Sequence, residues 1–319
     1  MAEPDQPDAA SSSSETERDY SNWMANLSEK LCCEPLKNIA IPGSHNSFTS
    51  SLDVKSGVAP GSPDTIRNLV HFFGNKAKEI VYKWSVNQSL TLTEQLDRGI
   101  RYFDLRVSSC LGKEDLHFVH GLFAGKVVDA MNEINTWLES HPKEVVLLDF
   151  NHLFDMQDTH HTQLTKQLME IFGSKICPSI DVDGCALNIL WENQWQVIVF
   201  YHNDIAHSNH NLWHGSMIPS VWPRTPEAPK MVNILEAYHT KGRNPDKFHV
   251  TQGVLTPTGT TILANIGRDL KSVCAIMAIR NLQFYLKDKT IGAKGVNIVI
   301  ADFIELHDFV SSVLALNDR

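Results

Sequence analysis

The sequence has few of the features that mark several large classes of protein. It carries 28 Lys and Arg residues against 37 Asp and Glu residues, a formal net charge of −9, so we expect no basic surface of the kind that binds nucleic acids. No apolar run in the sequence approaches the ~20 residues that cross a bilayer. No glycine-rich loop of the dinucleotide or P-loop type is present. Any anionic ligand must therefore be held by a local positive group.

Cysteine is also scarce, and its pattern excludes a disulfide framework. The six cysteines are scattered without a C-x-x-C pair, and the polar, acidic N-terminus does not resemble a signal peptide. We expect reduced thiols in a cytoplasmic protein, with the nucleus as the alternative location. If the substrate is a lipid, the protein must visit membranes transiently.

The order of apolar and polar stretches predicts one large α/β domain. Residues 1–19 are acidic and Ser-rich, and we expect a disordered tail. The domain then spans 20–319 and begins with a short amphipathic helix through Trp23, Met24 and Leu27. Seven apolar runs are typical of buried parallel strands: Leu36–Ile41, Arg101–Val107, Leu116–His120, Val145–Phe150, Gln196–Tyr201, Phe248–Leu255 and Val296–Ile300.

Helical stretches alternate with these runs, and irregular segments interrupt them. The pattern of strand, helix and strand favours a parallel sheet closed into a single, irregular TIM-like (β/α) barrel. We expect loops at Cys177–Cys185 and Asp204–Pro229. The clearest helical stretches are Val127–Ser140, Thr159–Phe172, Ala228–Thr240, Ile262–Leu286 and Ile304–Leu316.

Polar side chains follow several of the predicted strands, where barrel enzymes place their chemistry. Two histidines can act as base and acid in one transfer, because imidazole titrates near neutral pH. An arginine can hold a phosphate, and an aspartate can fix a histidine tautomer. Together these groups suit phosphodiester cleavage. The residues are His45, Arg106, His120, Asp149, Asn151 and Asp302.

Spacing alone leaves other interpretations of the histidines open. The chain has 15 of them, so two at strand ends can arise by chance. His207, His210 and His214 could suggest a zinc site, but they lie in a Pro-flanked loop without a cysteine at ligand spacing, which favours a solvated loop. His160 and His161 lie in a polar helical stretch and are expected to face solvent.

Five segments resemble the X domain of phosphatidylinositol-specific phospholipases C, in order along almost all of residues 20–317. The sequence is most similar to the small, stand-alone X-domain proteins, which lack the regulatory domains of the large signalling enzymes. The segments are IPGSHNSF at 41–48, GIRYFDLR at 99–106, HFVHG at 117–121, EVVLLDFNH at 144–152 and NIVIADF at 297–303.

The resemblance implies a reaction and a role for each catalytic residue. His45 takes the proton of the inositol 2-hydroxyl, which attacks the adjacent phosphorus. Arg106 stabilises the phosphoryl oxygens, and His120 protonates the leaving diacylglycerol oxygen. Asp302 orients His45. A cyclic inositol phosphate forms first and is then opened by water. The intramolecular nucleophile and the preorganised positive charge both favour the reaction.

The second segment bears on the metal requirement. Asp104-Leu105-Arg106 is similar to the calcium-independent bacterial enzymes, so no cofactor and no metal are expected, and calcium is kept as the alternative. Asn46 departs from this pattern, because those enzymes have Asp at that position. The change would weaken the polarisation of His120. Asp104 and Asn46 complete the candidate catalytic set.

The groups that would hold the inositol ring are less well defined by the sequence. Tyr201 sits where relatives bind the ring, and Trp222 is a candidate stacking residue for which a core or surface role is the alternative. Asp149 and Asn151 share one face of their strand, opposite Phe150, and either face could line the site.

Two other functions compete with a phosphoinositide phospholipase. A catalytically weak lipid-binding or scaffold protein could use the same fold. A glycerophosphodiesterase would depend on a metal held by carboxylates. The few basic residues near the proposed site favour unphosphorylated phosphatidylinositol, and the oligomeric state is not specified.

Overall fold

Ten strands form one sheet in the computed structural model, which describes residues 19–62, 70–71 and 74–319. They run in the order β7–β6–β5–β2–β1–β10–β9–β8, and every pair along this path is parallel. β3 pairs with the C-terminal end of β2 and also with β4, and both of these pairings are antiparallel. The strands are β1 (Ile41–Ser44), β2 (Tyr102–Ser108), β3 (His117–His120), β4 (Leu122–Lys126), β5 (Val146–Phe154), β6 (Val197–Tyr201), β7 (Trp213–His214), β8 (Ser220–Val221), β9 (Val250–Gln252) and β10 (Ile298–Ala301).

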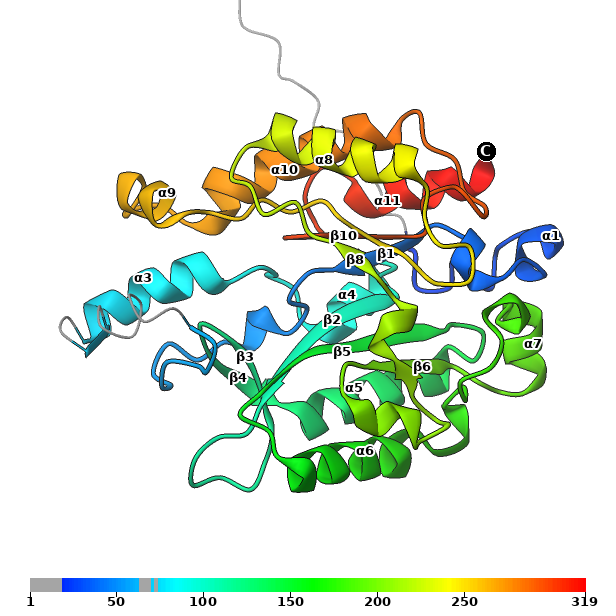
Figure 1. The fold of residues 1–319 in the computed structure, drawn as a ribbon, viewed down its shortest axis with the longest axis horizontal. Coiled ribbons are helices and arrows are strands. Elements are labelled where there is room, and N and C mark those ends of the chain that lie inside the picture. Colours follow the sequence, from blue (N-terminus) through cyan, green and yellow to red (C-terminus); the bar gives the residue numbers. More distant parts are fainter. Residues whose placement is uncertain (1–18, 63–69, 72–73) are drawn as a thin grey trace, which may run out of the picture.

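Helices cover the outside of the curved sheet. Figure 1 shows α5 and α6 along one side of the sheet and α8, α10 and α11 along the opposite side. α5 buries Val127, Met131, Ile134 and Leu138, the spacing of one helical face. The helices are α1 (Glu29–Cys32), α3 (Asn75–Ser85), α4 (Leu92–Asp97), α5 (Val127–Ser140), α6 (Asp158–Phe172), α7 (Leu187–Glu192), α8 (Ala228–Lys241), α9 (Gly259–Ala264), α10 (Ile276–Leu286) and α11 (Phe309–Leu314).

Two apolar cores lie on the two faces of the sheet. The larger core contains the buried faces of α5, α6, α8 and α10 together with the outward side chains of the strands. The smaller core fills the barrel interior with side chains from several strands: Ile41, Tyr102, Leu147, Phe200, Val250 and Ile300. Because side chains alternate along a strand, residues two positions further on point into the same interior.

The predicted α/β barrel class is confirmed, although the sheet is not paired all the way round. Within the described residues, β7 and β8 pair with other strands but not with each other, so the barrel is open there. The expected disordered tail, residues 1–19, lies outside the described residues except for Asp19. Helix Val127–Ser140 was predicted with its observed bounds.

Several predicted elements differ from the observed ones. Leu36–Ile41 begins as a 3-10 turn, and the strand starts only at Ile41. The run ending at His120 is a strand, but it is antiparallel. Ile262–Leu286 is divided into α9, a π-turn at Lys271–Ala275 and α10, and the break after α9 contains Gly267, a poor helix former. The helix expected through Trp23 is a series of turns, and Ile304–Leu316 narrows to α11.

Candidate active site

The alternation of side chains along the parallel strands assembles the candidate site at the C-terminal mouth of the barrel. In β2 and β10, the side chain two residues after the last interior apolar residue is polar and points to the same side of the sheet. Tyr102 is followed by Asp104 and Arg106, and Ile300 is followed by Asp302. Below them the barrel is filled by apolar side chains. The polar side chains at the mouth of the barrel therefore pack against the apolar side chains that fill its interior.

His45 is held between a carboxylate and two hydrogen-bond donors. Its Nδ1 lies 2.7 Å from Oδ1 of Asp302, so Nδ1 carries the proton and donates. Its Nε2 lies 3.1 Å from Nη2 of Arg106 and 3.3 Å from Nδ2 of Asn46. Because both of these neighbours donate, Nε2 is the acceptor nitrogen. Asn87 also donates to Asp302, at 2.8 Å. The tautomer of His45 is thus the one that a general base requires.

His120 lines the same cavity from the end of β3. Its Nδ1 lies 2.8 Å from the carbonyl oxygen of Ser85, the last residue of α3, so Nδ1 donates and Nε2 is left for a substrate. Burial and the positive charge of Arg106 lower the pKa of His120 to about 3. An anion bound beside Arg106 would offset that charge and favour protonation of His120.

Arg106 supplies the positive charge of the site. Its Nη2 lies 3.4 Å from Oδ2 of Asp104, and its Nε is buried without a hydrogen-bond partner among the described residues. Burial alone would raise the pKa of Asp104, but the charges of Arg106 and His45 and hydrogen bonds from Asn46 and Asn151 hold it well below its usual range. Asp104 is therefore an ionised group that anchors Arg106.

Asn46 connects the first catalytic segment to a residue that the sequence analysis missed. It has a positive φ of 45°, which Asn tolerates better than most residues. Its Nδ2 lies 3.0 Å from Oδ1 of Asn87. No hydrogen bond joins Asn46 to His120 in the described structure, where His120 is bonded to Ser85 instead. The expected effect of Asn46 on His120 is therefore not supported by the contacts.

A second polar group continues the site across β5 and β6. Asn151 donates to Asp104 at 2.6 Å. Tyr102 donates to Asp149 at 2.6 Å, and Nε2 of His202 lies 2.8 Å from the same carboxylate. Burial opposes a charged His202, but Asp149 outweighs it and raises the pKa of His202. The face of Asp149 and Asn151 thus points into the barrel, and Phe150 packs outside in the helix-covered core.

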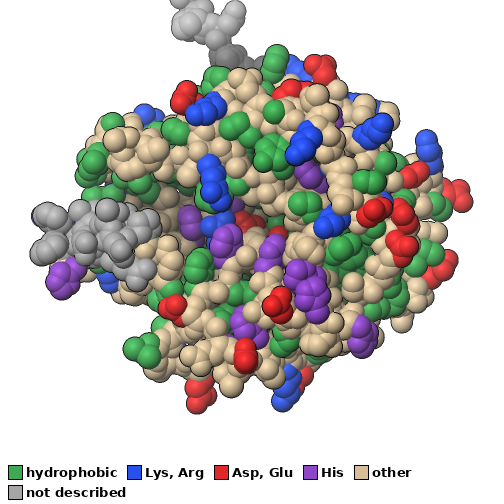
Figure 2. Space-filling view, viewed as in Figure 1, with side chains coloured by type: hydrophobic (Ala, Val, Ile, Leu, Met, Phe, Trp, Pro, Cys, Tyr) green, Lys and Arg blue, Asp and Glu red, His purple; other side chains and the backbone are tan. Residues whose placement is uncertain are grey.

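His45, Arg106 and His120 border one cavity of about 450 Å³. Figure 2 shows a hollow in this face of the molecule, where His side chains gather beside Lys or Arg and Asp or Glu side chains. The volume lies in the range of small-ligand sites, roughly 300–1,000 Å³. The lining residues include His45, Arg106, His120 and Trp222. Trp222 is 42% exposed, donates to Thr256 at 2.8 Å and carries the guanidinium of Arg224 over its ring.

The structure does not bring Tyr201 to the site. Phe200 points into the barrel, so its neighbour Tyr201 points outward. The Tyr201 hydroxyl lies 2.8 Å from Nδ1 of His161 on α6. The same contact makes the expectation for His161 wrong, because its side chain is buried rather than facing solvent. The Tyr201 hydroxyl and the His161 imidazole are therefore hydrogen-bonded to each other in the core between the sheet and α6.

Two residues that were not predicted from the sequence support His45 and Asp302 from outside the strand ends. Gln88 donates to the carbonyl oxygens of His45 and Ala301, each at 2.9 Å. Asn87 bridges Asn46 and Asp302. Both follow α3, a helix the analysis did not predict, and both are buried. The available signal was Ile80, Val81 and Trp84, an apolar face followed by polar residues.

Part of the suggested zinc set is close in space. Ligand atoms of Asp204, His207 and His214 lie within 4.8 Å of one another, and His210 is not part of this group. Nδ1 of His214 already accepts the backbone N–H of Ser216 at 3.2 Å. None of these residues borders the catalytic cavity.

The donor set beside Arg106 does not fit calcium, which takes six to eight oxygen ligands. The nearest carboxylate, Asp104, accepts hydrogen bonds from Asn46, Asn151 and Arg106. The guanidinium of Arg106 already places a positive charge 3.4 Å from this carboxylate, and like charges repel.

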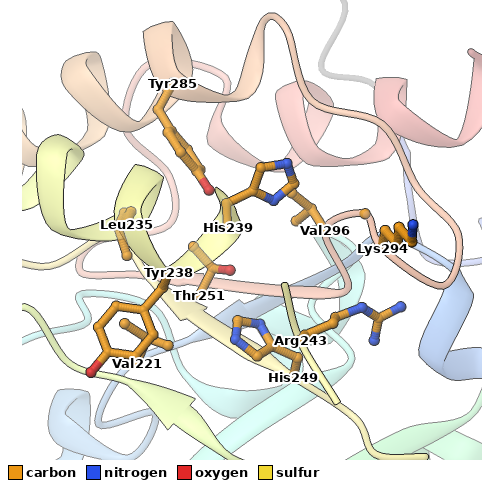
Figure 3. A pocket seen from close by; sticks show the side chains of 11 residues that line it. Val221, Leu235, Tyr238, His239, Arg243, His249, Thr251, Tyr285, Lys294 and Val296 are labelled. Atoms are coloured by element: carbon orange, nitrogen blue, oxygen red, sulfur yellow. The ribbon is translucent and has the colours of Figure 1, made fainter. Parts of the chain in front are cut away.

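A second pocket lies between the sheet and the outer helices. Figure 3 shows His239, His249, Arg243 and Tyr285 around it. Its volume of about 20 Å³ is enough for roughly one water molecule, which excludes a lipid head group. Burial, with Arg243 and His239 nearby, lowers the pKa of His249 to about 4.

Comparisons with known proteins agree with this architecture. A family model described as PI-PLC X 1 matches residues 70–178. The chain is 42% identical over 310 residues to PI-PLC X domain-containing protein 3 of Mus musculus, which covers 97% of both chains. It is 41% identical over 268 residues to PI-PLC X domain-containing protein 2 of Homo sapiens, covering 83% of this chain and 87% of that protein. The chain belongs to the PI-PLC X domain-containing protein family.

A solved structure supports the fold assignment. A mutant of the phosphatidylinositol-specific phospholipase C from Staphylococcus aureus superposes with a TM-score of 0.65 at 14% identity, over 94% of this chain and 97% of that one. At this identity the likeness concerns the fold, that of the phosphatidylinositol-specific phospholipase C barrels. A search of the described helices finds none that combines the length and apolarity needed to cross a membrane.

Proposed function

We propose that this protein is a phospholipase C-type phosphodiesterase that cleaves phosphatidylinositol. The observation that carries the proposal is the position of His45, Arg106 and His120 on one cavity. The tautomers inferred from their contacts leave Nε2 of His45 as an acceptor and Nε2 of His120 for the leaving group. This is the division of labour that an acid–base pair needs.

The reaction begins with proton transfer to His45. Nε2 of His45 takes the proton of the inositol 2-hydroxyl, and the oxygen attacks the adjacent phosphorus. Asp302 stabilises the imidazolium that forms, since it accepts the Nδ1 proton at 2.7 Å. Nε of Arg106, which has no hydrogen-bond partner in the part of the chain that the structure describes, and Nη2 can donate to phosphoryl oxygens, where negative charge develops.

The bond to the lipid then breaks. Protonated His120 gives its Nε2 proton to the departing diacylglycerol oxygen, which leaves a cyclic inositol phosphate. The negative charge of the bound phosphate offsets the positive charge of Arg106 and so favours the protonated form of His120 that this step requires. Water can open the cyclic product with the two histidines in exchanged roles.

The charge of the site favours an inositol ring without further phosphates. Among the described residues that border the cavity, Arg106 is the sole Lys or Arg. One guanidinium matches the single phosphodiester of phosphatidylinositol. We place the protein in the cytoplasm, from which it reaches the lipid by transient peripheral contact with membranes.

The proposal is tested with phosphatidylinositol vesicles, in calcium and in chelator. Wild type is expected to release cyclic inositol phosphate under both conditions with a bell-shaped pH profile. His45→Ala and His120→Ala should each lower kcat by about 10²-fold or more. Lys113→Ala, an exposed substitution outside the cavity, is the control. Vesicle binding without turnover would contradict the proposed activity and indicate a lipid-binding protein. Activity only in the presence of a metal ion would indicate a metal-dependent phosphodiesterase.

A further inference from the structure

The catalytic cavity has an extended apolar wall that a polyol head group does not require. Beyond His45, Arg106 and His120, no titratable side chain of the described residues borders it. Much of the remaining lining is aliphatic or aromatic. It includes Ile80, Val81 and Trp84 of α3, Trp222 after β8, Ile262 of α9 and Leu270 after α9. An inositol ring presents hydroxyls in all directions, so this wall would leave them without partners.

Part of the apolar wall comes from a different side of the barrel than the polar network. The polar network of Asp104, Asn151 and Asp149 comes from β2 and β5, on one side of β1, and does not border the cavity. Trp222 and Ile262 come from segments after β8 and β9, on the other side of β1. These two side chains are therefore separated from the polar network by β1, whereas Phe154, at the end of β5, borders the cavity on the side of the network.

The apolar wall adjoins His120 in particular. α3 contributes Val81 and Trp84 to the wall, and its last carbonyl, from Ser85, holds Nδ1 of His120 at 2.8 Å. Gly121, directly after His120, lies so close to Ser85 and Val81 that a Cβ would meet both. In the proposed reaction His120 serves the leaving group, so the wall lies where the leaving group departs.

Trp84 offers an independent indication that a ligand enters this part of the cavity. Its side chain is 6% exposed, and its indole N–H has no hydrogen-bond acceptor among the described residues. A buried Trp N–H normally has a partner, and leaving it unpaired costs free energy. A polar atom of a bound ligand, such as an ester carbonyl oxygen, would supply the acceptor.

We propose that the apolar wall binds the glycerol and the first acyl methylenes of the lipid, so the leaving group is held inside the protein while the phosphodiester is cut. This inference rests on the proposed phospholipase activity and adds to it a determinant of specificity. The enzyme would recognise the phosphodiester through the two histidines and Arg106, and the diacylglycerol through the wall.

Short-chain substrates separate this contact from docking to a bilayer. We would compare inositol phosphodiesters of methanol, dibutyroylglycerol and dihexanoylglycerol, all kept below the concentration at which they aggregate. Each methylene that leaves water for the wall should raise kcat/KM by about fourfold. Equal kcat/KM across the three substrates would overturn the inference.

Two neighbouring residues of α9 give a matched pair of variants. Ile262 borders the cavity, whereas Leu263 is 71% exposed and does not. Ile262→Ser is expected to lower the ratio of kcat/KM between the dihexanoyl and methyl substrates severalfold, and Leu263→Ser to leave that ratio at the wild-type value. Equal ratios in the two variants would contradict the proposed contact, because the wall would then have no part in discrimination.

The outcomes distinguish this inference from the proposed function. Cleavage of the methyl substrate without any dependence on chain length would sustain the phosphodiesterase and reject the wall as a lipid site. Absence of cleavage of every soluble substrate and of phosphatidylinositol vesicles would reject the phosphodiesterase, and the inference with it.

Discussion

At the scale of single residues, the site depends on groups that fix the protons of its histidines. Asp302 accepts from Nδ1 of His45, and it is held in turn by Asn87 at 2.8 Å. The Asp302 side chain is 1% exposed, so water does not compete for the contact. Its charge and its acceptor oxygens both favour the base-competent tautomer of His45.

Asp302→Asn tests this dependence without removing bulk. An amide at this position can present its N–H₂ group to His45, which would favour the wrong tautomer and remove the charge that stabilises imidazolium. We expect kcat for phosphatidylinositol cleavage to fall by about 10²- to 10⁴-fold with a much smaller change in KM. Asp308→Asn, at an exposed position, is the control. Wild-type kcat in a folded Asp302→Asn protein would show that the tautomer is set elsewhere.

At the scale of secondary-structure elements, the contact between α3 and the β3–β4 turn positions His120. Gly121 forms the turn with φ of +71°, and a Cβ there would meet Ser85 and Val81. The carbonyl of Ser85 is the acceptor for His120. A side chain at Gly121 would therefore push away the helix end that orients the second histidine.

Gly121→Ala and Gly112→Ala separate this effect from backbone strain. Gly112 also has a positive φ, +78°, but open space surrounds it. Gly112→Ala should lower the free energy of unfolding by roughly 1–2 kcal/mol, since it places a Cβ at positive φ. Gly121→Ala should lower it further, because its Cβ also meets Ser85 and Val81. Only Gly121→Ala should also lower kcat, by about tenfold or more if His120 moves by ~1 Å. Urea unfolding and turnover measure the two effects, and equal kcat values would refute the positioning role.

At the scale of the whole molecule, buried neutral histidines make stability depend on pH. Burial and the nearby charges of Arg243 and His239 lower the pKa of His249 from 6.5 to about 4. Lys294 and Tyr285 border the same pocket, and no carboxylate of the described residues does. Between these two pH values the unfolded chain binds more protons than the folded one. The free energy of unfolding therefore decreases as the pH falls through this window, by about 1.4 kcal/mol per unit from this group.

His249→Gln removes the titrating group while keeping a polar side chain. The wild-type protein should lose more stability than the variant between pH 7 and pH 4.5, with a difference of about 2 kcal/mol. Urea titrations at a series of pH values measure it. His210→Gln, at an exposed position, should follow the wild-type curve. Parallel curves for His249→Gln and wild type would mean that His249 is not the linked group.

How much the sequence predicts differs between the sheet and the site. The runs at β6 and β10 are continuous and apolar because these strands are covered on both faces. Those at β2 and β5 are interrupted by polar residues of the site, such as Asp104 and Asp149. All four runs were located within a few residues. β3 was assigned the wrong direction, since an apolar run carries no information about its partner. Short β7 and β8 were missed, because two residues each give no periodicity to detect.

The sequence by itself determined the barrel class and the chemistry available at the strand ends, because interior apolar residues and the polar ones after them lie in the same local pattern. Only the tertiary structure decided which face each side chain takes and which distant groups complete the site. Asn87 lies beside His45 although 42 residues separate them in the sequence, and Ser85 contacts His120 from 35 residues away. Tyr201 points away from the site because successive side chains of a strand point to opposite faces. Such contacts depend on how helices pack on the sheet, which no local pattern encodes.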